Sequence, residues 1–380
     1  MSLKINGERI REARLFKGLT ITDFSKKIGV SKQMLSKYEH NSSSINIETL
    51  QRIVSVLQFP IAFFTSTYTV PYENYGTFYR SRLTANQAAK QPIEFYKKAT
   101  AFLRDYFEQY IDFPSLDYCD FSSYSPQEAA LKLREVWKLG NGPIQNIVSL
   151  MESHGIVIAN VNLNEDKVDA TSGFIKVDGN NYYIVVNNVS ESNFYRQQFS
   201  LAHELGHYVM HASIEGYSLQ NLDGEEYRTM ENEANQFASA FLLPKSSFEK
   251  DLSKIDLTNL LSFVPLKSIW NTSIAAMIIR ARDLQMINLQ TYEKLQKSKS
   301  YRKWNKREIN DDDKPLVKPI VLNKSFKLLE EHTDITPNNL ASHVNVSHGY
   351  YYPNEILSQI LDIDLSKFKG DLIELKMKMS

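Results

Sequence analysis

Short amphipathic helices are predicted along the first 68 residues, where apolar side chains recur three and four positions apart. Helical patterns cover 8–16, 20–27 and 32–40, and a further one begins after Asn46. Gly29 separates the second pattern from the third, which gives the helix, turn and helix of a helix-turn-helix motif. We therefore predict an N-terminal bundle of five helices.

Strands are predicted farther along the chain, at 157–161, 173–177 and 182–186, where the residues alternate or are β-branched. The Asp-Gly-Asn-Asn stretch at 178–181 favours a hairpin turn, because glycine and asparagine tolerate positive φ. In the second strand Lys176 faces away from its two apolar neighbours. This alternation predicts a small, half-buried antiparallel sheet.

The complete pattern predicts a mainly helical α+β fold in three parts. These are a helix-turn-helix domain at 1–68, a middle domain at 75–300, and a charged connector with a small helical C-terminal region at 301–380. Within the middle domain, 75–150 is a helical lead-in and 151–250 holds the sheet and two longer helices. Residues 69–77 lack a helical period and are expected to form a linker, and the charged stretch 300–315 is expected to be exposed.

Positive and negative residues are unevenly distributed between the N-terminus and the rest of the chain. The 380 residues are 42% apolar and 12% aromatic, as expected for a globular protein, and the formal net charge is zero. The first 70 residues hold ten Lys or Arg and five Asp or Glu, which leaves +5 there and −5 elsewhere. With Arg9, Arg11 and Arg14 expected on the outside of the first helix, this asymmetry favours a nucleic-acid-binding end.

The chain offers few features of a secreted or membrane protein. Its single cysteine, Cys119, cannot form an internal disulfide and suits a reducing compartment. No apolar run has the length of a membrane span, and the N-terminus lacks the apolar stretch of a signal peptide. We expect a cytoplasmic protein without a membrane partner.

The most informative chemistry lies in an apolar helical pattern at 199–211, which contains His203-Glu204-Leu205-Gly206-His207. Helix positions four apart lie above one another, so two imidazoles can reach one metal ion. Glu204 lies beside them, where it could take a proton from a metal-bound water. Because buried histidines and glutamates are costly unless they bind something, this pattern predicts a Zn²⁺ site.

A third ligand is expected on the next helical pattern, at 231–244. Glu231 precedes the apolar stripe of that helix by three residues and should face the same partner, and Glu233 is the alternative. His211 follows His203 by eight residues, about 12 Å along a helix, so it cannot share the ion. We expect His211 and Asn235 beside the metal site, and the polar stretch 213–229 as a loop at its rim.

These two helices resemble the ImmA/IrrE family of zinc metallopeptidases. The resemblance rests on H-E-L-G-H followed by E-x-E-A-N-x-F-A-x-x-F-L-L-P, and it extends over roughly 75–300. It implies that His203, His207 and Glu231 bind Zn²⁺ and that Glu204 is the general base of a gluzincin-like endopeptidase. It also implies a protein substrate, such as a repressor of phage, mobile-element or stress genes.

Residues 19–39 resemble the XRE, or Cro/phage-repressor, class of helix-turn-helix domains. With Leu35 and Tyr38 packed inward, the third helix would present four polar residues to double-stranded DNA: Lys32, Gln33, Ser36 and Lys37. Glutamine suits adenine, and lysine suits guanine or phosphate. This class usually binds paired half-sites, so a homodimer is expected. The alternative is the solvated polar face of a protein-binding bundle.

Two other functions stay open at this point. The chain could be a transcription factor whose zinc site is structural or inactive, or a component of a toxin–antitoxin or phage-defence pair. The intact Glu204 favours a peptidase, because a structural zinc site needs no base beside the metal.

Overall fold

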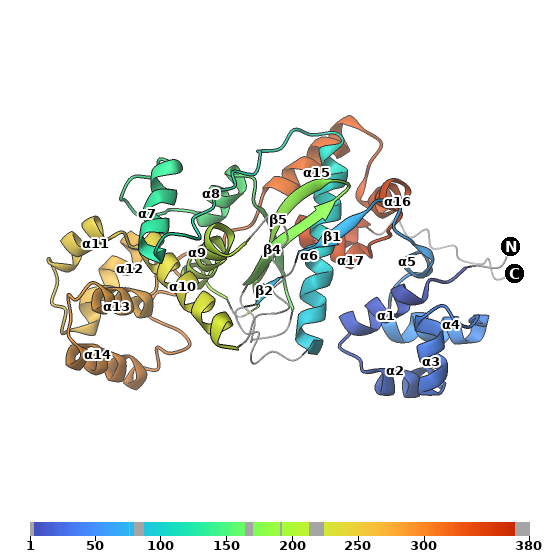
Figure 1. The fold of residues 1–380 in the computed structure, drawn as a ribbon, viewed down its shortest axis with the longest axis horizontal. Helices are drawn as coiled ribbons and strands as arrows, with labels where there is room; N and C mark the ends of the chain where they lie inside the picture. Colours follow the sequence, from blue (N-terminus) through green and yellow to red (C-terminus); the bar gives the residue numbers. More distant parts are fainter. Residues whose placement is uncertain are drawn as a thin grey trace, which may run out of the picture.

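The structure is a computed structural model that describes residues 4–75, 77–79, 87–163, 170–190, 192–212 and 224–368. Helices dominate these ranges, and one small sheet lies near the centre of the molecule (Figure 1). The predicted mainly helical α+β class is confirmed. Among the described residues, none of the helices is long and apolar enough to cross a membrane.

The N-terminal bundle consists of the five short helices that were predicted. They are α1 (Gly7–Phe16), α2 (Ile21–Ile28), α3 (Lys32–Glu39), α4 (Ile47–Leu57) and α5 (Ile61–Thr65). The side chains of Thr20, Ser31 and Asn46 each accept a backbone hydrogen bond at the start of a helix. Gly29 ends α2 at φ 70°, a left-handed conformation that glycine adopts without strain.

The sheet has the order β1-β4-β5-β3, and β2 also pairs with β4. Its strands are β1 (Tyr72–Asn74), β2 (Phe78–Tyr79), β3 (Val157–Val161), β4 (Ala170–Val177) and β5 (Asn180–Asn188). A two-residue turn at Asp178 and Gly179, both with positive φ, joins β4 to β5. Because this hairpin pairs β4 with β5, β3 takes the other edge of β5 and runs parallel to it. The prediction of an entirely antiparallel sheet is therefore wrong for β3.

The sheet separates two hydrophobic cores. Ile175, Val177 and Ile184 face α6 (Gln87–Glu108), whereas Phe174 and Tyr183 face α9 (Phe194–Met210). Because helices cover both faces, the predicted half-buried sheet is wrong, and within β4 only Lys176 is not fully buried. Residues 69–77, predicted as a linker, instead supply β1, because the outer edge of β4 offers them hydrogen-bonding partners.

Two long helices, α9 and α10 (Gly224–Leu242), pack against each other on one face of the sheet. Gly206 permits their close approach, since a Cβ there would lie 3.1 Å from the Phe237 ring and 3.2 Å from Ala234 Cα. Around them lie α7 (Pro126–Val136), α8 (Ile147–Ser153), α11 (Lys245–Leu252), α12 (Val264–Trp270), α13 (Ile274–Asp283) and α14 (Leu289–Tyr301).

The C-terminal helices lie beside α6 and the outer strand β3 (Figure 1). They are α15 (Val321–His332), α16 (Pro337–His348) and α17 (Asn354–Leu361). Their apolar residues, among them Phe326, Leu340 and Leu357, belong to the same core as α6 and the N-terminal bundle. This end of the chain therefore helps to hold the bundle against the rest of the molecule.

A buried polar cluster fixes the N-terminal bundle in place. Arg9 lies beside the stacked rings of Tyr68 and Tyr350, 4.3 Å from each ring centre, and its Nη1 is 2.5 Å from Glu12 Oε2. Glu12 also pairs with Lys98 of α6 and accepts a hydrogen bond from Tyr350. The expectation that Arg9 faces solvent is wrong, because this cluster leaves it only 3% exposed.

Arg14 is buried as well, contrary to the same expectation. Its guanidinium donates two hydrogen bonds, of 2.6 and 2.9 Å, to the carboxylate of Glu39 at the end of α3. This ion pair ties α1 to α3 inside the bundle. Arg11 is exposed, as predicted.

We predict that Glu12→Ala lowers the free energy of unfolding by about 3 kcal/mol, because it leaves buried cations without their partner. As a control, Glu48→Ala removes an exposed ion pair with Arg52 and should cost less than about 0.5 kcal/mol. Urea denaturation of the full chain measures both values. Equal losses for the two variants would contradict a stabilising role for the buried cluster.

The same cluster predicts a pH dependence. Burial acts to raise the pKa of Glu12, but Lys98 and Arg9 outweigh it and lower that pKa below its ordinary value of 4.5. A carboxyl with a lowered folded-state pKa stabilises above the unfolded pKa and loses that effect as the pH falls. The stability difference between the wild type and Glu12→Ala should therefore shrink as the pH is lowered below about 4.5.

Candidate metal centre and DNA-binding face

Three of the predicted site residues lie together between α9 and α10. His203 and His207 lie one turn apart on α9 and are fully buried, and Glu231 approaches them from α10. Because α10 begins at Gly224, seven residues before the predicted start, Glu231 lies in its interior and is not an exposed acid of the first turn.

The spacing of the three side chains fits one metal ion. The Nε2 atoms of His203 and His207 are 3.1 Å apart, and Glu231 oxygens lie 3.5 and 3.3 Å from them. Ligands about 2.0–2.1 Å from a tetrahedral zinc are separated from one another by about 3.3 Å. In addition, Glu231 Oε1 is buried and accepts no hydrogen bond from any described residue. The cluster can therefore hold a divalent metal.

The ionisation states of these groups suit metal binding. Burial lowers the pKa of His207 to about 4, so its imidazole is neutral at physiological pH. Burial acts to raise the pKa of Glu231, but its contacts with His203 and His207 outweigh it and hold that pKa well below the ordinary value. The cluster thus offers a neutral imidazole at His207 and a carboxylate at Glu231.

Further polar residues orient the two histidines. Asn235 Oδ1 lies 3.0 Å from His203 Nδ1, and His211 Nδ1 lies 3.0 Å from His207 Nδ1. When the Nδ1–H groups of His203 and His207 are the donors in these contacts, the Nε2 atoms of both residues keep their lone pairs directed at the cluster. His211 and Asn235 therefore lie beside the site, where they were expected.

Glu233, the alternative third ligand, points elsewhere. Its carboxylate lies 2.9 Å from His211 Nε2 and extends the chain of contacts that starts at His207. Burial, together with the neighbouring His207, lowers the pKa of His211 to about 4, so His211 is neutral, and its single N–H, on Nε2, donates a hydrogen bond to Glu233. Glu231 thus contacts His203 and His207 directly, whereas Glu233 contacts His211, which lies behind His207.

Glu204 is 1% exposed, and its carboxylate contacts the sheet. Ser172 of β4 donates a hydrogen bond of 2.5 Å to Glu204 Oε2, and the Tyr183 hydroxyl lies 2.7 Å from Ser172 Oγ. Burial and the charge of Glu204 raise the pKa of Tyr183, so its hydroxyl stays protonated as a donor. Sequence reasoning missed Ser172 and Tyr183, since only their alternation on neighbouring strands hints at a shared face.

An aromatic ring covers one side of the cluster. Phe78 of β2 stacks on the imidazole of His207, with ring centres 4.5 Å apart and planes inclined by 12°. It lies opposite Ser172 in the pairing of β2 with β4. The sequence pattern gave no signal for this contact, because Phe78 directly follows the stretch predicted to be a linker.

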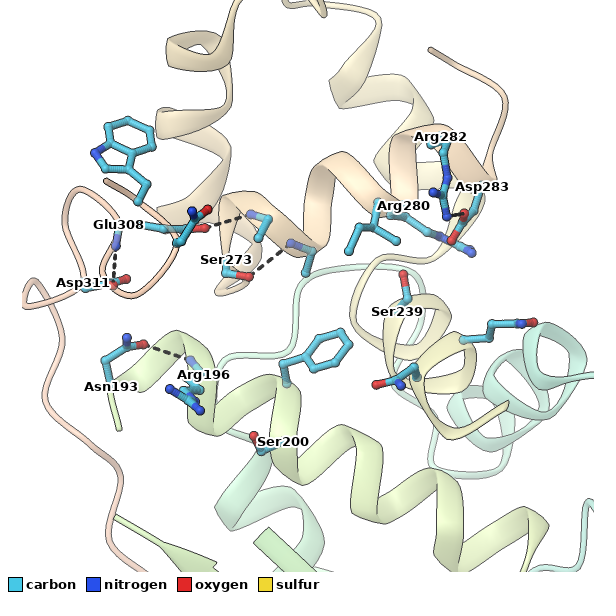
Figure 2. A pocket seen from close by; sticks show the side chains of 18 of the residues that line it. Asn193, Arg196, Ser200, Ser239, Ser273, Arg280, Arg282, Asp283, Glu308 and Asp311 are labelled. Carbon is cyan, nitrogen blue, oxygen red and sulfur yellow. Dashed lines mark hydrogen bonds and ion pairs between the residues drawn. The ribbon is translucent and has the colours of Figure 1, made fainter. Parts of the chain in front are cut away.

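A separate hollow of about 900 Å³ lies between α9, α10 and α13 (Figure 2). Arg196 and Ser200 of α9, Ser239 of α10 and Arg280 of α13 are among the residues that line it. Its lining includes Asn235, which contacts His203, but none of the three candidate ligands. This hollow is therefore distinct from the space around the two Nε2 atoms.

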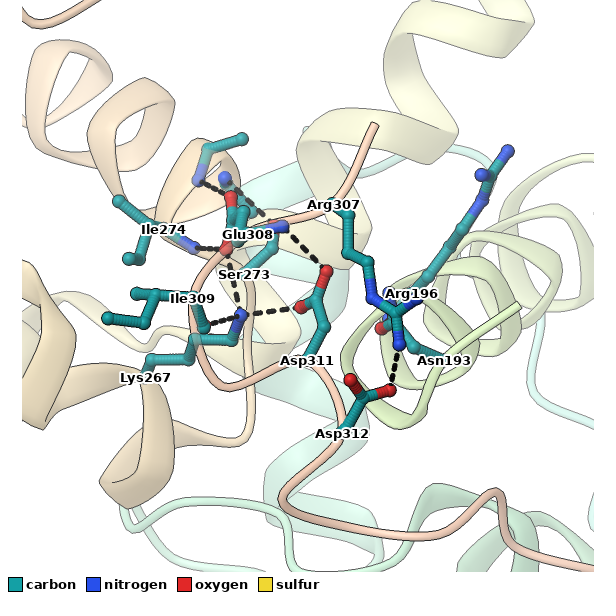
Figure 3. A network of polar contacts seen from close by, with 12 residues as sticks. Asn193, Arg196, Lys267, Ser273, Ile274, Arg307, Glu308, Ile309, Asp311 and Asp312 are labelled. Atoms are coloured by element: carbon teal, nitrogen blue, oxygen red, sulfur yellow. Dashed lines mark hydrogen bonds and ion pairs between the residues drawn. The ribbon is translucent and has the colours of Figure 1, made fainter. Parts of the chain in front are cut away.

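A buried lysine contacts Glu308 and Asp311, two of the residues that line this hollow (Figure 3). Lys267 donates hydrogen bonds of 3.1 Å to Glu308, 2.5 Å to Asp311 and 2.8 Å to the carbonyl of Ile309. Glu308 also accepts from the first backbone amides of α13. The stretch 300–315, expected to be exposed throughout, is anchored here because its acids neutralise Lys267.

The proposed DNA-reading residues lie on one surface of the bundle. Lys32, Gln33 and Lys37 are exposed on α3, and Ser36 is half-buried between them. Leu35 and Tyr38 pack into the core, as predicted. α3 therefore presents a continuous polar face with two cations.

The fold and the cluster together define a helix-turn-helix domain joined to a metallopeptidase-type domain. Residues 10–64 match the helix-turn-helix family model, and residues 151–282 match the model of the M78 peptidase family, described as the IrrE N-terminal-like domain. The two matches confirm the predicted fusion of an XRE-type domain with an ImmA/IrrE-like domain. A search among curated proteins gives no match to the chain.

We predict that Glu231→Ala abolishes stoichiometric zinc binding, because it removes one of three converging ligands. Glu233→Ala is the matched control on the same helix and should keep one zinc per chain, with at most a weakened affinity. Metal content after dialysis, measured by plasma mass spectrometry, decides between them. Full metal in Glu231→Ala and none in Glu233→Ala would reverse our assignment.

We predict that Gln33→Ala relaxes sequence preference at one base pair of the operator, at a cost of about 1–3 kcal/mol. Lys37→Ala should instead weaken binding to all sequences and reduce the salt dependence, as expected for a phosphate contact. Selection from a random DNA library, followed by affinity measurements at several salt concentrations, tests both. A full-length chain with no salt-dependent DNA affinity would refute the DNA-binding face.

Proposed function

We propose that this chain is a DNA-binding transcriptional regulator whose zinc-dependent endopeptidase domain cleaves a protein partner such as a repressor. The observation that carries the proposal is the placement of Glu204. It is buried next to the two histidines, and Ser172 holds its carboxylate. A purely structural zinc site gives such a glutamate no role.

In this proposal His203, His207 and Glu231 hold the zinc. The bound zinc would polarise a peptide carbonyl and acidify a water molecule. Glu204 accepts the proton of the attacking water and later gives it to the leaving amine. The hydrogen bond from Ser172 fixes the Glu204 carboxylate for both transfers, and Asn235 and His211 keep each histidine in the required tautomer.

The N-terminal domain would direct the chain to its DNA site. We propose that Lys32, Gln33, Ser36 and Lys37 contact double-stranded DNA and that the chain acts as a homodimer on paired half-sites. The proposed division is 1–68 for DNA binding, 75–300 for the peptidase and 301–380 for support. Cleavage of a repressor bound nearby in the cytoplasm would then relieve transcription of phage, mobile-element or stress genes.

We predict that Glu204→Gln keeps one zinc per chain and lowers cleavage of a repressor substrate by at least about 10²-fold, because it removes only the base. His203→Ala is the companion variant and should lose the metal as well. Candidate repressors are incubated with each zinc-loaded protein, and the products are identified by mass spectrometry. Undiminished cleavage by Glu204→Gln would rule out this residue as the base.

A further inference from the structure

The outer edge of β4 is covered by residues that directly follow the N-terminal bundle. We call residues 72–75 and 77–79 the strap. Within it, β1 pairs with β4 from Val177 to Ile175, and β2 pairs with β4 at Ser172 and Thr171, both antiparallel. The other edge of β4 is paired with β5 along its whole length. An extended peptide that joined β4 would therefore have to take the place of the strap.

The strap reaches the metal cluster at a defined position. Phe78 lies directly opposite Ser172, the residue that holds the Glu204 carboxylate. Directly paired residues on antiparallel strands point to the same face, and here that face carries α9. The Phe78 ring accordingly lies flat on His207 and is 3% exposed.

The strap lies where a peptide substrate would bind by adding a strand to the sheet. An extended peptide gains affinity from main-chain hydrogen bonds to a free sheet edge and specificity from pockets for alternate side chains. We propose that the strap is an internal pseudosubstrate, which occupies the peptide-binding edge of β4, and that the slot filled by Phe78 is a subsite for an aromatic residue of the substrate. This inference rests on the proposed peptidase function and specifies its substrate as an extended segment with an aromatic side chain.

The strap is held by specific contacts that can be broken. Lys97 of α6 is 1% exposed, and its Nζ donates hydrogen bonds of 2.8 Å to Asn74 Oδ1 and 3.0 Å to Thr77 Oγ1. Asn74 in turn donates to Glu94, at 2.9 Å. Glu73 and Asn74 of β1 are exposed, whereas the Tyr72 ring packs against Tyr68 and Phe102.

The strap is also close to the DNA-binding domain along the chain. Tyr68, four residues before β1, packs on Arg9 of α1 and on Tyr72 of the strap itself. A shift of the bundle relative to α6 would therefore pull on the strap. Docking of the bundle thus helps to keep the strap on β4.

The inference is tested with a fluorescein-labelled peptide that has the sequence of residues 72–79, added to the zinc-loaded full chain. All proteins carry Glu204→Gln, so that binding is measured without cleavage. Phe78→Ala should bind the peptide about tenfold or more tighter than the parent, because the internal ring no longer competes for the slot. The same peptide with alanine in place of its phenylalanine should show no such gain.

Two further variants complete the binding experiment. Glu73→Ala changes an exposed strap residue away from the metal and should bind the peptide like the parent. Lys97→Met keeps the apolar volume of α6 but removes both anchors, and it should raise peptide affinity without any change to Phe78. Metal content and thermal unfolding confirm that each variant is folded and loaded. Unchanged peptide affinity in both Phe78→Ala and Lys97→Met would overturn the inference.

A cleavage experiment separates this inference from the proposed function. Fluorescein-labelled casein is incubated with zinc-loaded chains that retain Glu204. Faster hydrolysis by Phe78→Ala and Lys97→Met than by the wild type supports both proposals. If Phe78→Ala and Lys97→Met bind the peptide more tightly but no protein hydrolyses casein, the pseudosubstrate role of the strap is supported and the proposed peptidase activity is refuted. Hydrolysis by the wild type at the same rate as by both variants supports the peptidase and refutes the pseudosubstrate.

Discussion

The close packing of α9 against α10 is the constraint on which the site depends. The three candidate ligands come from two helices separated by a stretch of the chain, so their convergence requires the helix axes to approach closely. Gly206 lies between the two histidines, against Ala234 and Phe237 of α10. A larger side chain at Gly206 would push α10 away and move Glu231 out of reach of the Nε2 atoms. The small residues of this contact are thus as much a part of the site as the ligands.

The sheet gives the site its remaining polar groups. One of its faces packs against α6, and the other supplies Ser172 and Tyr183 to Glu204. A carboxylate buried beside the His203 and His207 side chains would be unstable without donors, and these hydroxyls provide one direct hydrogen bond and one relayed hydrogen bond. The position of β4 therefore determines both the orientation of Glu204 and the edge along which a peptide could lie.

The parts of this molecule that could be predicted from its sequence are those with local causes. Helix geometry alone places His203 and His207 on one face, and cap residues such as Thr20 and Ser31 mark helix starts. Ser172, Phe78 and Arg9 could not be assigned in the same way, because their partners lie far away in the sequence. The parallel pairing of β3 likewise depends on which edge of β5 is free, a property of the assembled sheet. For Glu231 and Glu233, the helix pattern favoured one residue, and only the folded contacts show that the two serve different histidines.

The burial of Arg9 and Arg14 leaves the excess positive charge on the surface of the N-terminal bundle unchanged. Arg14 pairs with Glu39, and Arg9 pairs with Glu12. Each buried arginine is therefore matched by one carboxylate, and the two pairs have no net charge. The excess of five positive charges in the first 70 residues is therefore carried by the side chains that remain outside, among them Lys32 and Lys37 on α3. Burial of the matched pairs also removes carboxylates that would otherwise repel phosphates. The contacts that dock the bundle onto α6 thus leave its positive charge free to act on DNA.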